Sequence, residues 1–151
     1  RQMCIRDSNE GFAKGESKNP SIQNSSYSLS EGYAFDLQLL IRSHERANSK
    51  KQPIHEIIVG NAVEKLPQVL KNEDLPVALA IFDMNAFKPT FETLQQILPK
   101  LNKGSFISFW QFTRPEINGE RKAFEKIRKL LPEFILHKSD TYPSLIHCEI
   151  L

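Results

Sequence analysis

An apolar run at residues 77–82 constrains the fold of this chain more than any other feature, because it ends in an acid, Asp83. A Lys-Pro-Thr step at residues 88–90 then opens a helix. Strands that are buried on both faces have such continuous apolar runs, and they occur in parallel sheets. Ligands bind outside the carboxyl ends of the strands in open α/β sheets. The run therefore predicts a strand covered on both faces, with Asp83 at the edge where a binding site would lie.

Hydrophobic periodicity predicts that strands and helices alternate along the chain. In chain order, we expect a helix near 36–44, a strand at 55–59, a helix at 62–70, the strand at 77–82, a helix from Pro89 to near Pro99, a strand at 106–112, a helix at 120–131 and two strands at 133–138 and 144–151. Pro67 must lie near the start of its helix or kink it. The alternation indicates an α/β sheet, mostly parallel, that ends in an antiparallel edge pair.

The size and net charge of the chain indicate a single domain and argue against nucleic-acid binding. The chain has 151 residues, the size of one domain, and its formal charge is +2, from 20 basic and 18 acidic residues. This balance argues against nucleic-acid binding, and the basic residues between 121 and 129 read as the solvated face of a helix rather than a phosphate or membrane patch.

No apolar stretch is long enough to span a bilayer, and no signal peptide is visible. Two cysteines, Cys4 and Cys148, form neither a disulfide framework nor a metal-binding spacing, which favours a reducing cytoplasm.

The first 32 residues are expected to lie outside the folded portion at 33–151. Residues 1–8 resemble the translation of a sequencing adapter, and such segments are excluded from fold reasoning. Residues 13–32 are rich in Ser, Asn, Lys and Gly and lack an apolar period. This composition predicts a loop or lid over residues 9–32.

The block at residues 83–90 is similar to the acid-x-acid-x-Tyr-Glu-Pro-Thr segment of the macrocin O-methyltransferase family. The similarity continues in order through residues 58–62, 64–67, 98–104 and 115–121. Within the last segment, Asn-Gly-Glu at 118–120 resembles the Pro-Gly-Glu of the family. The similarity spans roughly residues 30–151, and the order and spacing of its segments carry it more than any single motif.

Members of this family are S-adenosylmethionine (SAM)-dependent sugar O-methyltransferases with a Rossmann-like sheet. The resemblance therefore implies a partial class I methyltransferase sheet, SAM as the cofactor and a small-molecule acceptor, with a sugar as the candidate. The first strand and the Gly-rich turn that hold the methionine end of SAM in such enzymes have no counterpart here, which implies a C-terminal portion. In an alternative interpretation, residues 7–12 resemble the segment at the end of the second strand in this family. The acid of that segment, here Asp7, would contact the SAM ribose.

Sugar O-methylation requires the acceptor hydroxyl to be placed and its proton removed, which a divalent cation and a carboxylate base can do. In the family, the first acid of the motif binds the metal, the second acts as base, and an acid pair after the next strand completes the metal site. By resemblance, Asp83 keeps the first metal ligand and Asn85 stands at the base position. Trp110 and Gln111 replace the acid pair. One carboxylate alone makes a poor Mg²⁺ site, which argues against the family's metal-dependent route.

On the cofactor side, Gly60, Asn61 and Ala62 resemble the Gly-Asp-Ala step at which such enzymes contact the adenine of SAM. Asn61 would accept a hydrogen bond from the adenine amino group, and the alternative is a turn-forming Asn. Asp83 is a further candidate for cofactor binding, with helix capping or pairing with a lysine as its alternatives. Trp110 is expected on the acceptor side with Gln111, as a wall of the site or as part of the core.

Three functions remain open from the sequence. The leading hypothesis is an incomplete SAM-dependent O-methyltransferase-like domain related to enzymes that methylate sugar hydroxyls. The second is a catalytically silent relative with a binding or scaffolding role, which the neutral Asn85, Trp110 and Gln111 favour. The third is an α/β portion of a protein with another activity, because a fold does not determine a function.

Overall fold

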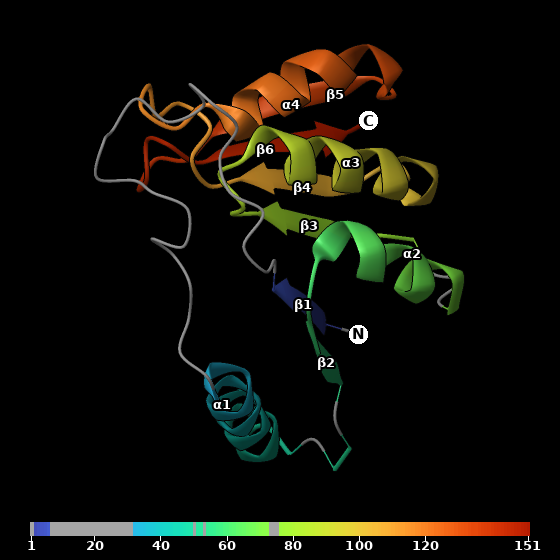
Figure 1. Cartoon of the computed structure of the whole chain (residues 1–151), viewed down its shortest axis with the longest axis vertical. Coiled ribbons are helices and arrows are strands. Elements are labelled where there is room, and N and C mark those ends of the chain that lie inside the picture. The colour runs from blue at the N-terminus through green and yellow to red at the C-terminus, as the bar shows by residue number, and fades with distance from the viewer. Residues whose placement is uncertain (1, 7–31, 50, 53, 73–75) are drawn as a thin grey trace.

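Strands and helices alternate along the chain, as its periodicity predicts (Figure 1). The computed structural model describes residues 2–6, 32–49, 51–52, 54–72 and 76–151. In chain order, the elements are β1 (Gln2–Arg6), α1 (Tyr33–Ala47), β2 (His55–Val59), α2 (Ala62–Asn72), β3 (Leu79–Phe82), α3 (Phe87–Ile97), β4 (Phe106–Phe109), α4 (Gly119–Ile127), β5 (Phe134–Lys138) and β6 (Ile146–Ile150). Short 3₁₀ turns follow α3 at Leu98–Lys100 and α4 at Arg128–Leu130.

Hydrogen bonding arranges the described strands in two groups. β1 and β2 pair in parallel, and the other four strands form a sheet in the order β3-β4-β6-β5. Within that sheet β3 and β4 are parallel, whereas β6 runs antiparallel to both β4 and β5. The predicted antiparallel pair is therefore present, with β5 at the edge and β6 between β5 and β4. The α/β fold class is confirmed.

The core lies between the four-stranded sheet and the helices α2, α3 and α4, which lie on one face of the strands (Figure 1). Phe82 of β3 and Phe109 of β4 stack with ring centroids 5.5 Å apart, and Phe124 of α4 meets Phe109 edge-on. Burying a side chain of this kind contributes roughly 1.5–3 kcal/mol. The buried core consists of Leu66, Phe82, Leu94, Ile97, Leu101, Ile107, Phe109, Ala123, Phe124, Ile127, Cys148 and Ile150.

The opposite face of β3 is exposed, which corrects one prediction. Leu79 and Ile81 are 55% and 63% exposed, whereas Phe82 is buried. The prediction of a strand covered on both faces was wrong for the described part of the chain, because α2, α3 and α4 cover only one face of the sheet. Leu130, at a position within the helix predicted at 120–131, is also exposed, because α4 ends at Ile127 and a 3₁₀ turn follows it.

β4 is shorter than predicted, because a turn begins at Trp110. The aromatic run at 106–112 has a strand-like composition throughout, but only Phe106–Phe109 forms the strand. Phe112 packs from the turn against Phe109 and Phe124, so its apolar character serves the core and not the strand. The turn places Trp110 directly after the carboxyl end of β4.

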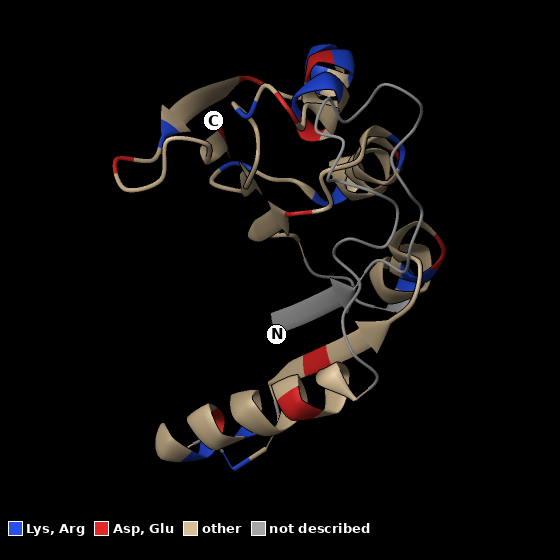
Figure 2. Cartoon of the chain, turned by 60° about the vertical axis from the view of Figure 1, so that its left-hand side comes forward, with Lys and Arg blue, Asp and Glu red and all other residues tan. Residues whose placement is uncertain are grey.

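Charged residues of both signs are interspersed on the helices (Figure 2). On α4, Arg121 lies 3.7 Å from Glu125, one turn later in the same helix. This arrangement is that of a solvated helix face, as the sequence predicts. Among the residues that the structure describes, none of the helices is both long and apolar enough to cross a membrane.

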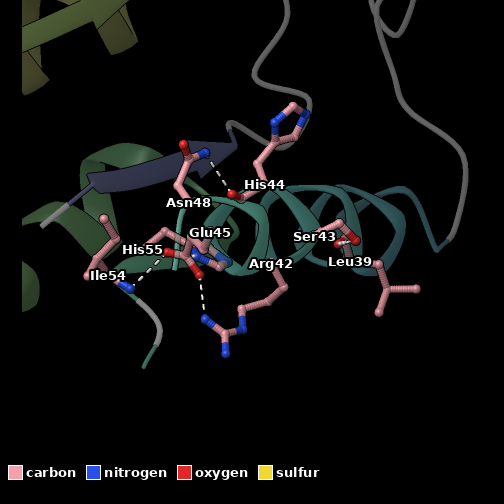
Figure 3. Close-up of polar contacts among 8 residues, drawn as sticks. All are labelled: Leu39, Arg42, Ser43, His44, Glu45, Asn48, Ile54 and His55. Carbon is pink, nitrogen blue, oxygen red and sulfur yellow. Dashed lines mark hydrogen bonds and ion pairs between the residues drawn. The ribbon is translucent and has the colours of Figure 1, made fainter. Parts of the chain in front are cut away.

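A buried carboxylate holds α1 to β2 (Figure 3). Glu45 accepts hydrogen bonds from Nδ1 of His55 (2.9 Å), from the backbone N–H of Ile54 (2.8 Å) and from Arg42 (2.6 Å). Burial acts to raise the pKa of Glu45, but these hydrogen bonds outweigh it and lower the pKa to about 2. The cluster lies at the amino end of β2, at the opposite end of that strand from Gly60.

Pro67 lies in the interior of α2 (Ala62–Asn72). It has no N–H to donate to the carbonyl of Val63, four residues earlier. The side chain of Gln96 in α3 donates to that carbonyl through Nε2, at 2.9 Å. A neighbouring helix therefore supplies the hydrogen bond that Pro67 removes, and α2 continues past the proline.

β1 occupies residues that the resemblance to an adapter excluded from the fold. Its backbone pairs in register with β2, with Gln2 opposite His55 and Arg6 opposite Val59. Asp7 and the loop or lid predicted at 9–32, apart from Gly32, lie outside the described residues. The interpretation of residues 1–8 and the boundary at residue 33 remain predictions.

Candidate functional site

The sequence-predicted site residues lie in three segments, each of which follows the carboxyl end of a strand. Gly60, Asn61 and Ala62 follow β2. Residues 83–86, named here the β3 loop, follow β3, and residues 110–114, named the β4 loop, follow β4. β3 and β4 are parallel neighbours and end at the same edge of the sheet (Figure 1). The fold therefore brings the β3 and β4 loops together, as expected for a ligand site in an open α/β sheet.

Asp83 is the first residue of the β3 loop and is exposed as a whole residue, although its carboxylate is partly desolvated by its neighbours. Partial burial of the carboxylate raises its pKa above the ordinary value of 3.8. The alternative role as a helix cap is not what the structure shows, because α3 begins after Ala86 without a side-chain cap. Within the described part of the chain, no lysine forms an ion pair with Asp83 either. The carboxylate is thus available to a ligand or to a proton.

Asn85 turns the β3 loop through a left-handed conformation, with φ of 63°. Asn tolerates this region better than most residues. Its side chain is buried, at 8% exposure, and its Oδ1 has no hydrogen-bond partner. Gly119 at the start of α4 packs against this turn so closely that a Cβ there would lie 2.2 Å from the carbonyl oxygen of Asn85. The backbone of α4 therefore abuts the β3 loop.

Glu120, the residue after Gly119, links the two loops. Its Oε1 accepts the backbone N–H of Asn85 at 3.2 Å, and its Oε2 accepts the backbone N–H of Gln111 at 2.9 Å. The side chain is almost completely buried, at 1% exposure. Burial raises the pKa of Glu120 to about 7, helped by the negative charge of Asp83 and opposed by the backbone hydrogen bonds.

Sequence reasoning did not identify Glu120 as a site residue. The only signal was the resemblance of Asn-Gly-Glu at 118–120 to a family motif, and that resemblance assigned the glutamate no role. Its importance depends on burial and on two backbone donors that lie 35 and 9 residues away in the chain. No local pattern carries that information.

Trp110 and Gln111 begin the β4 loop. The N–H of Trp110 donates to the carbonyl of Phe82 at 3.0 Å, which extends the β3–β4 pairing by one bond. Its ring is 39% exposed and stacks on Tyr142, with centroids 4.9 Å apart. This exposure argues against a place in the core, and the role of Trp110 as a wall of the site remains a prediction. Oε1 of Gln111 is buried without a hydrogen-bond partner.

The segment after β2 forms a tight turn into α2. Gly60 has φ of 139°, a conformation that favours glycine. Oδ1 of Asn61 accepts the N–H of Val63 at 2.9 Å, and its backbone carbonyl accepts the N–H groups of Glu64 and Lys65. Asn61 thus acts as the turn-forming residue that caps α2, the alternative that the sequence left open. Its proposed contact with adenine stays a prediction.

Among the described residues, the donor set of the β3 and β4 loops does not fit a divalent metal. Mg²⁺ and Ca²⁺ prefer carboxylate and other oxygen ligands. The two loops offer one exposed carboxylate, Asp83, beside the amides of Asn85 and Gln111. Glu120 is engaged with backbone N–H groups on both oxygens. Among the described residues, no group of three His, Cys, Asp or Glu side chains could hold a metal ion.

No protein-family model matches this chain, and no curated protein matches it. Solved structures do. CalS11, a calicheamicin methyltransferase, superposes with a TM-score of 0.83 at 21% identity, over 96% of this chain and 59% of that chain. The apo structure of CalS11, a TDP-rhamnose 3'-O-methyltransferase of calicheamicin biosynthesis, gives a TM-score of 0.71 at 25% identity, over 82% of this chain and 53% of that chain.

A third structure, an O-methyltransferase from Bacillus cereus in complex with SAH, gives a TM-score of 0.52 at 20% identity, over 82% of this chain and 60% of that chain. These matches establish a methyltransferase-like α/β fold. The chain spans between a half and three fifths of the length of the matched chains.

Proposed function

We propose that this chain is part of a SAM-dependent O-methyltransferase that acts on a hydroxyl group of a small molecule, with a sugar as the acceptor class. The observation that carries the proposal is the match to a sugar O-methyltransferase at 25% identity and a TM-score of 0.71. The place of the β3 and β4 loops at the carboxyl edge of the sheet supports it, because ligands bind there in such folds.

SAM supplies the electrophilic methyl group in this scheme, and the residues of the chain place and deprotonate the acceptor. Asp83 is the proposed base, because partial burial raises its pKa and so strengthens it as a proton acceptor. Asn85 and Gln111 carry buried amide oxygens without partners, and we assign their side chains to the acceptor side together with Trp110. Gly60, Asn61 and Ala62 are the proposed adenine side. No step passes through a metal ion, because the donor set does not fit one.

An Asp83→Asn variant of the protein expressed from its native locus tests this assignment. We expect it to bind SAM with unchanged affinity in a calorimetric titration, while methyl transfer falls by about 10²–10⁴-fold, the range of a lost general base. An Asp140→Asn variant, changed in the loop between β5 and β6, is the control. Unchanged turnover in the Asp83 variant would rule out Asp83 as the base.

The second candidate is a catalytically silent relative, which the neutral side chains of Asn85, Trp110 and Gln111 favour. A triple variant with Asn85→Asp, Trp110→Asp and Gln111→Glu restores the family's acids. Metal-dependent turnover in this variant, together with none in the unaltered protein, would favour the silent relative. Turnover by the unaltered protein would exclude it.

We also propose that the chain is the C-terminal portion of a longer methyltransferase. The share of the CalS11 chain that it spans and the exposed apolar face of β3 support this. Sequencing the native locus upstream of the Asn9 codon tests it: an apolar strand followed by a Gly-rich turn is the expected result. A start codon directly upstream would contradict it.

The remaining proposals concern partners and location. The small net charge supports a protein that does not bind nucleic acid. Burial raises the pKa of Cys148 to about 11, so this thiol is not reactive. A reducing cytoplasm remains the proposed compartment.

A further inference from the structure

The carboxyl group of Glu120 touches both loops of the candidate site, and no role in the proposed chemistry requires it. Each oxygen takes one backbone donor: Oε1 takes the N–H of Asn85 in the β3 loop, and Oε2 takes the N–H of Gln111 in the β4 loop. The two donors come from the ends of neighbouring strands. One side chain therefore spans the gap between the two loops.

We propose that Glu120 is a positioning residue that ties the β3 loop to the β4 loop and so sets the spacing between the two halves of the acceptor-side wall. The proposal rests on the proposed function for the identity of that wall. The bridge itself follows from the hydrogen bonds and does not depend on the reaction.

The packing around Glu120 leaves it little freedom. Its side chain is 1% exposed, and the preceding Gly119 abuts the carbonyl of Asn85, where even a Cβ would not fit. Glu120 also lies in the first turn of α4, where an acid is favoured by the helix dipole. The carboxyl group is therefore fixed by its own helix while it holds the two loops.

A salt bridge does not explain the burial of this acid. No cation pairs with Glu120 in the part of the chain that the structure describes, and burying a carboxylate without a partner is costly. Burial raises its pKa to about 7, so a proton can reside on it near neutrality. Asn85 and Gln111, whose backbone N–H groups Glu120 accepts, and Asn118, two residues before it, each have a buried amide oxygen without a partner.

The substitution Glu120→Gln distinguishes a side chain that bridges the two loops from one that only fills the space between them. Glutamine has the same size, but it has only one acceptor oxygen, and its NH₂ group cannot accept a backbone N–H. In Glu120→Gln we expect exchange of one of the two amide protons, of Asn85 or of Gln111, to speed up about tenfold or more by NMR. Glu125→Gln, on the exposed side of the same helix, is the control and should leave both amides unchanged.

The only tryptophan of the chain gives a second readout, because Trp110 lies in the β4 loop. Loosening that loop should shift the Trp110 emission to longer wavelength and lower its anisotropy in Glu120→Gln, and not in Glu125→Gln. In the proposed enzyme, the same variant should lower kcat/KM for the acceptor while the affinity for SAM stays unchanged. Loss of SAM affinity in all variants would count against the proposed function and leave the bridge intact.

Two results would overturn the bridge. One is a Glu120→Gln protein in which both amides exchange as slowly as in the wild type and Trp110 fluorescence is unchanged. The other needs no variant: in the wild-type chain, the amides of Asn85 and Gln111 would exchange at the rate of an unstructured peptide. If Glu120→Gln does not fold, this wild-type measurement decides.

Discussion

The chain leaves β3 through Asn85 in a left-handed conformation, and Gly119 of α4 packs directly against that turn. A Cβ at position 119 would lie 2.2 Å from the carbonyl oxygen of Asn85 and 2.5 Å from the nitrogen of Phe87. Both atoms are backbone atoms, so neither can rotate away. Glycine is therefore required by close approach of two chain segments.

We predict that Gly119→Ala lowers the free energy of unfolding by about 1–3 kcal/mol, the cost of overpacking a closed site. Urea unfolding followed by circular dichroism measures this change. Lys122→Ala, an exposed substitution on the same helix, should change the stability by less than about 0.5 kcal/mol. Equal stability of Gly119→Ala and the wild type would contradict the packing described for α4 and the β3 loop.

Glu120 makes the stability depend on pH in a defined window. Its pKa is about 7 in the folded chain, against 4.5 as its ordinary value, so the folded state binds the proton more tightly. The stabilisation is complete below pH 4.5 and is lost as the pH rises through 7. The difference between the two pKa values corresponds to on the order of 3 kcal/mol.

We therefore predict that the free energy of unfolding of the wild type, relative to Glu120→Gln, falls as the pH rises from 4.5 to above 7. Urea titrations of both proteins across this range measure the difference. Glu45, whose pKa is lowered to about 2, loses its contribution only as the pH falls below 4.5, outside this window. A difference that does not vary with pH would show that the acid is not perturbed.

At the scale of residues, the sequence located the loops better than it located their chemistry. Asp83 was predicted because an acid directly follows an apolar run, whereas Trp110 and Gln111 were named only by resemblance, and the roles of all three remain predictions. The sequence left two roles open for Asn61, contact with adenine and turn formation. The hydrogen bond from the N–H of Val63 shows that Asn61 forms the turn. Glu120 could not be found, because its burial comes from elements that are distant in sequence.

Element types were more predictable than element ends. The strand at 55–59 and the helix from Ala62 begin where periodicity placed them, because apolar spacing and the Gly-Asn turn are local signals. β4 and α4 end earlier than predicted, because Phe112 and Leu130 have the right composition but lie in turns. Pro67 was expected near a helix start or at a kink, and the partner that allows it inside α2 comes from another helix.

The hydrogen bond from Gln96 to the carbonyl of Val63 predicts a thermodynamic coupling between Pro67 and Gln96. In the wild type, Gln96→Leu leaves the carbonyl of Val63 without a donor and should destabilise the chain by about 1–2 kcal/mol. In a Pro67→Ala background, the introduced alanine supplies the backbone N–H, so the same substitution should cost little. A double-mutant cycle by urea unfolding measures the coupling. Equal costs of Gln96→Leu in the two backgrounds would mean that the side chain does not replace the missing bond.

For the whole molecule, the main feature is the exposed apolar side of β3. Leu79 and Ile81 are exposed on a strand that pairs with β4 on one side, and β1 and β2 form a separate pair. Exposed apolar edge strands promote association with other chains. The helices α2, α3 and α4 cover the other face of the sheet (Figure 1).

We predict that Ile81→Lys reduces self-association of the 151-residue chain and changes its stability by less than about 0.5 kcal/mol, as expected of an exposed site. Light scattering coupled to size-exclusion chromatography measures the association. Leu130→Lys is the matched control, because Leu130 is equally exposed, at 65%, but lies outside the sheet. An equal effect of the two substitutions would show that β3 is not the associating surface.

We propose that this fold serves SAM-dependent methyl transfer, and a calorimetric titration of SAM into the protein expressed from its native locus is the most direct test of that proposal. We expect saturable binding with one SAM per chain, and an affinity that survives Asp83→Asn because that residue is assigned to proton removal. Absence of any heat of binding, in a protein shown to be folded by circular dichroism, would contradict the proposed function.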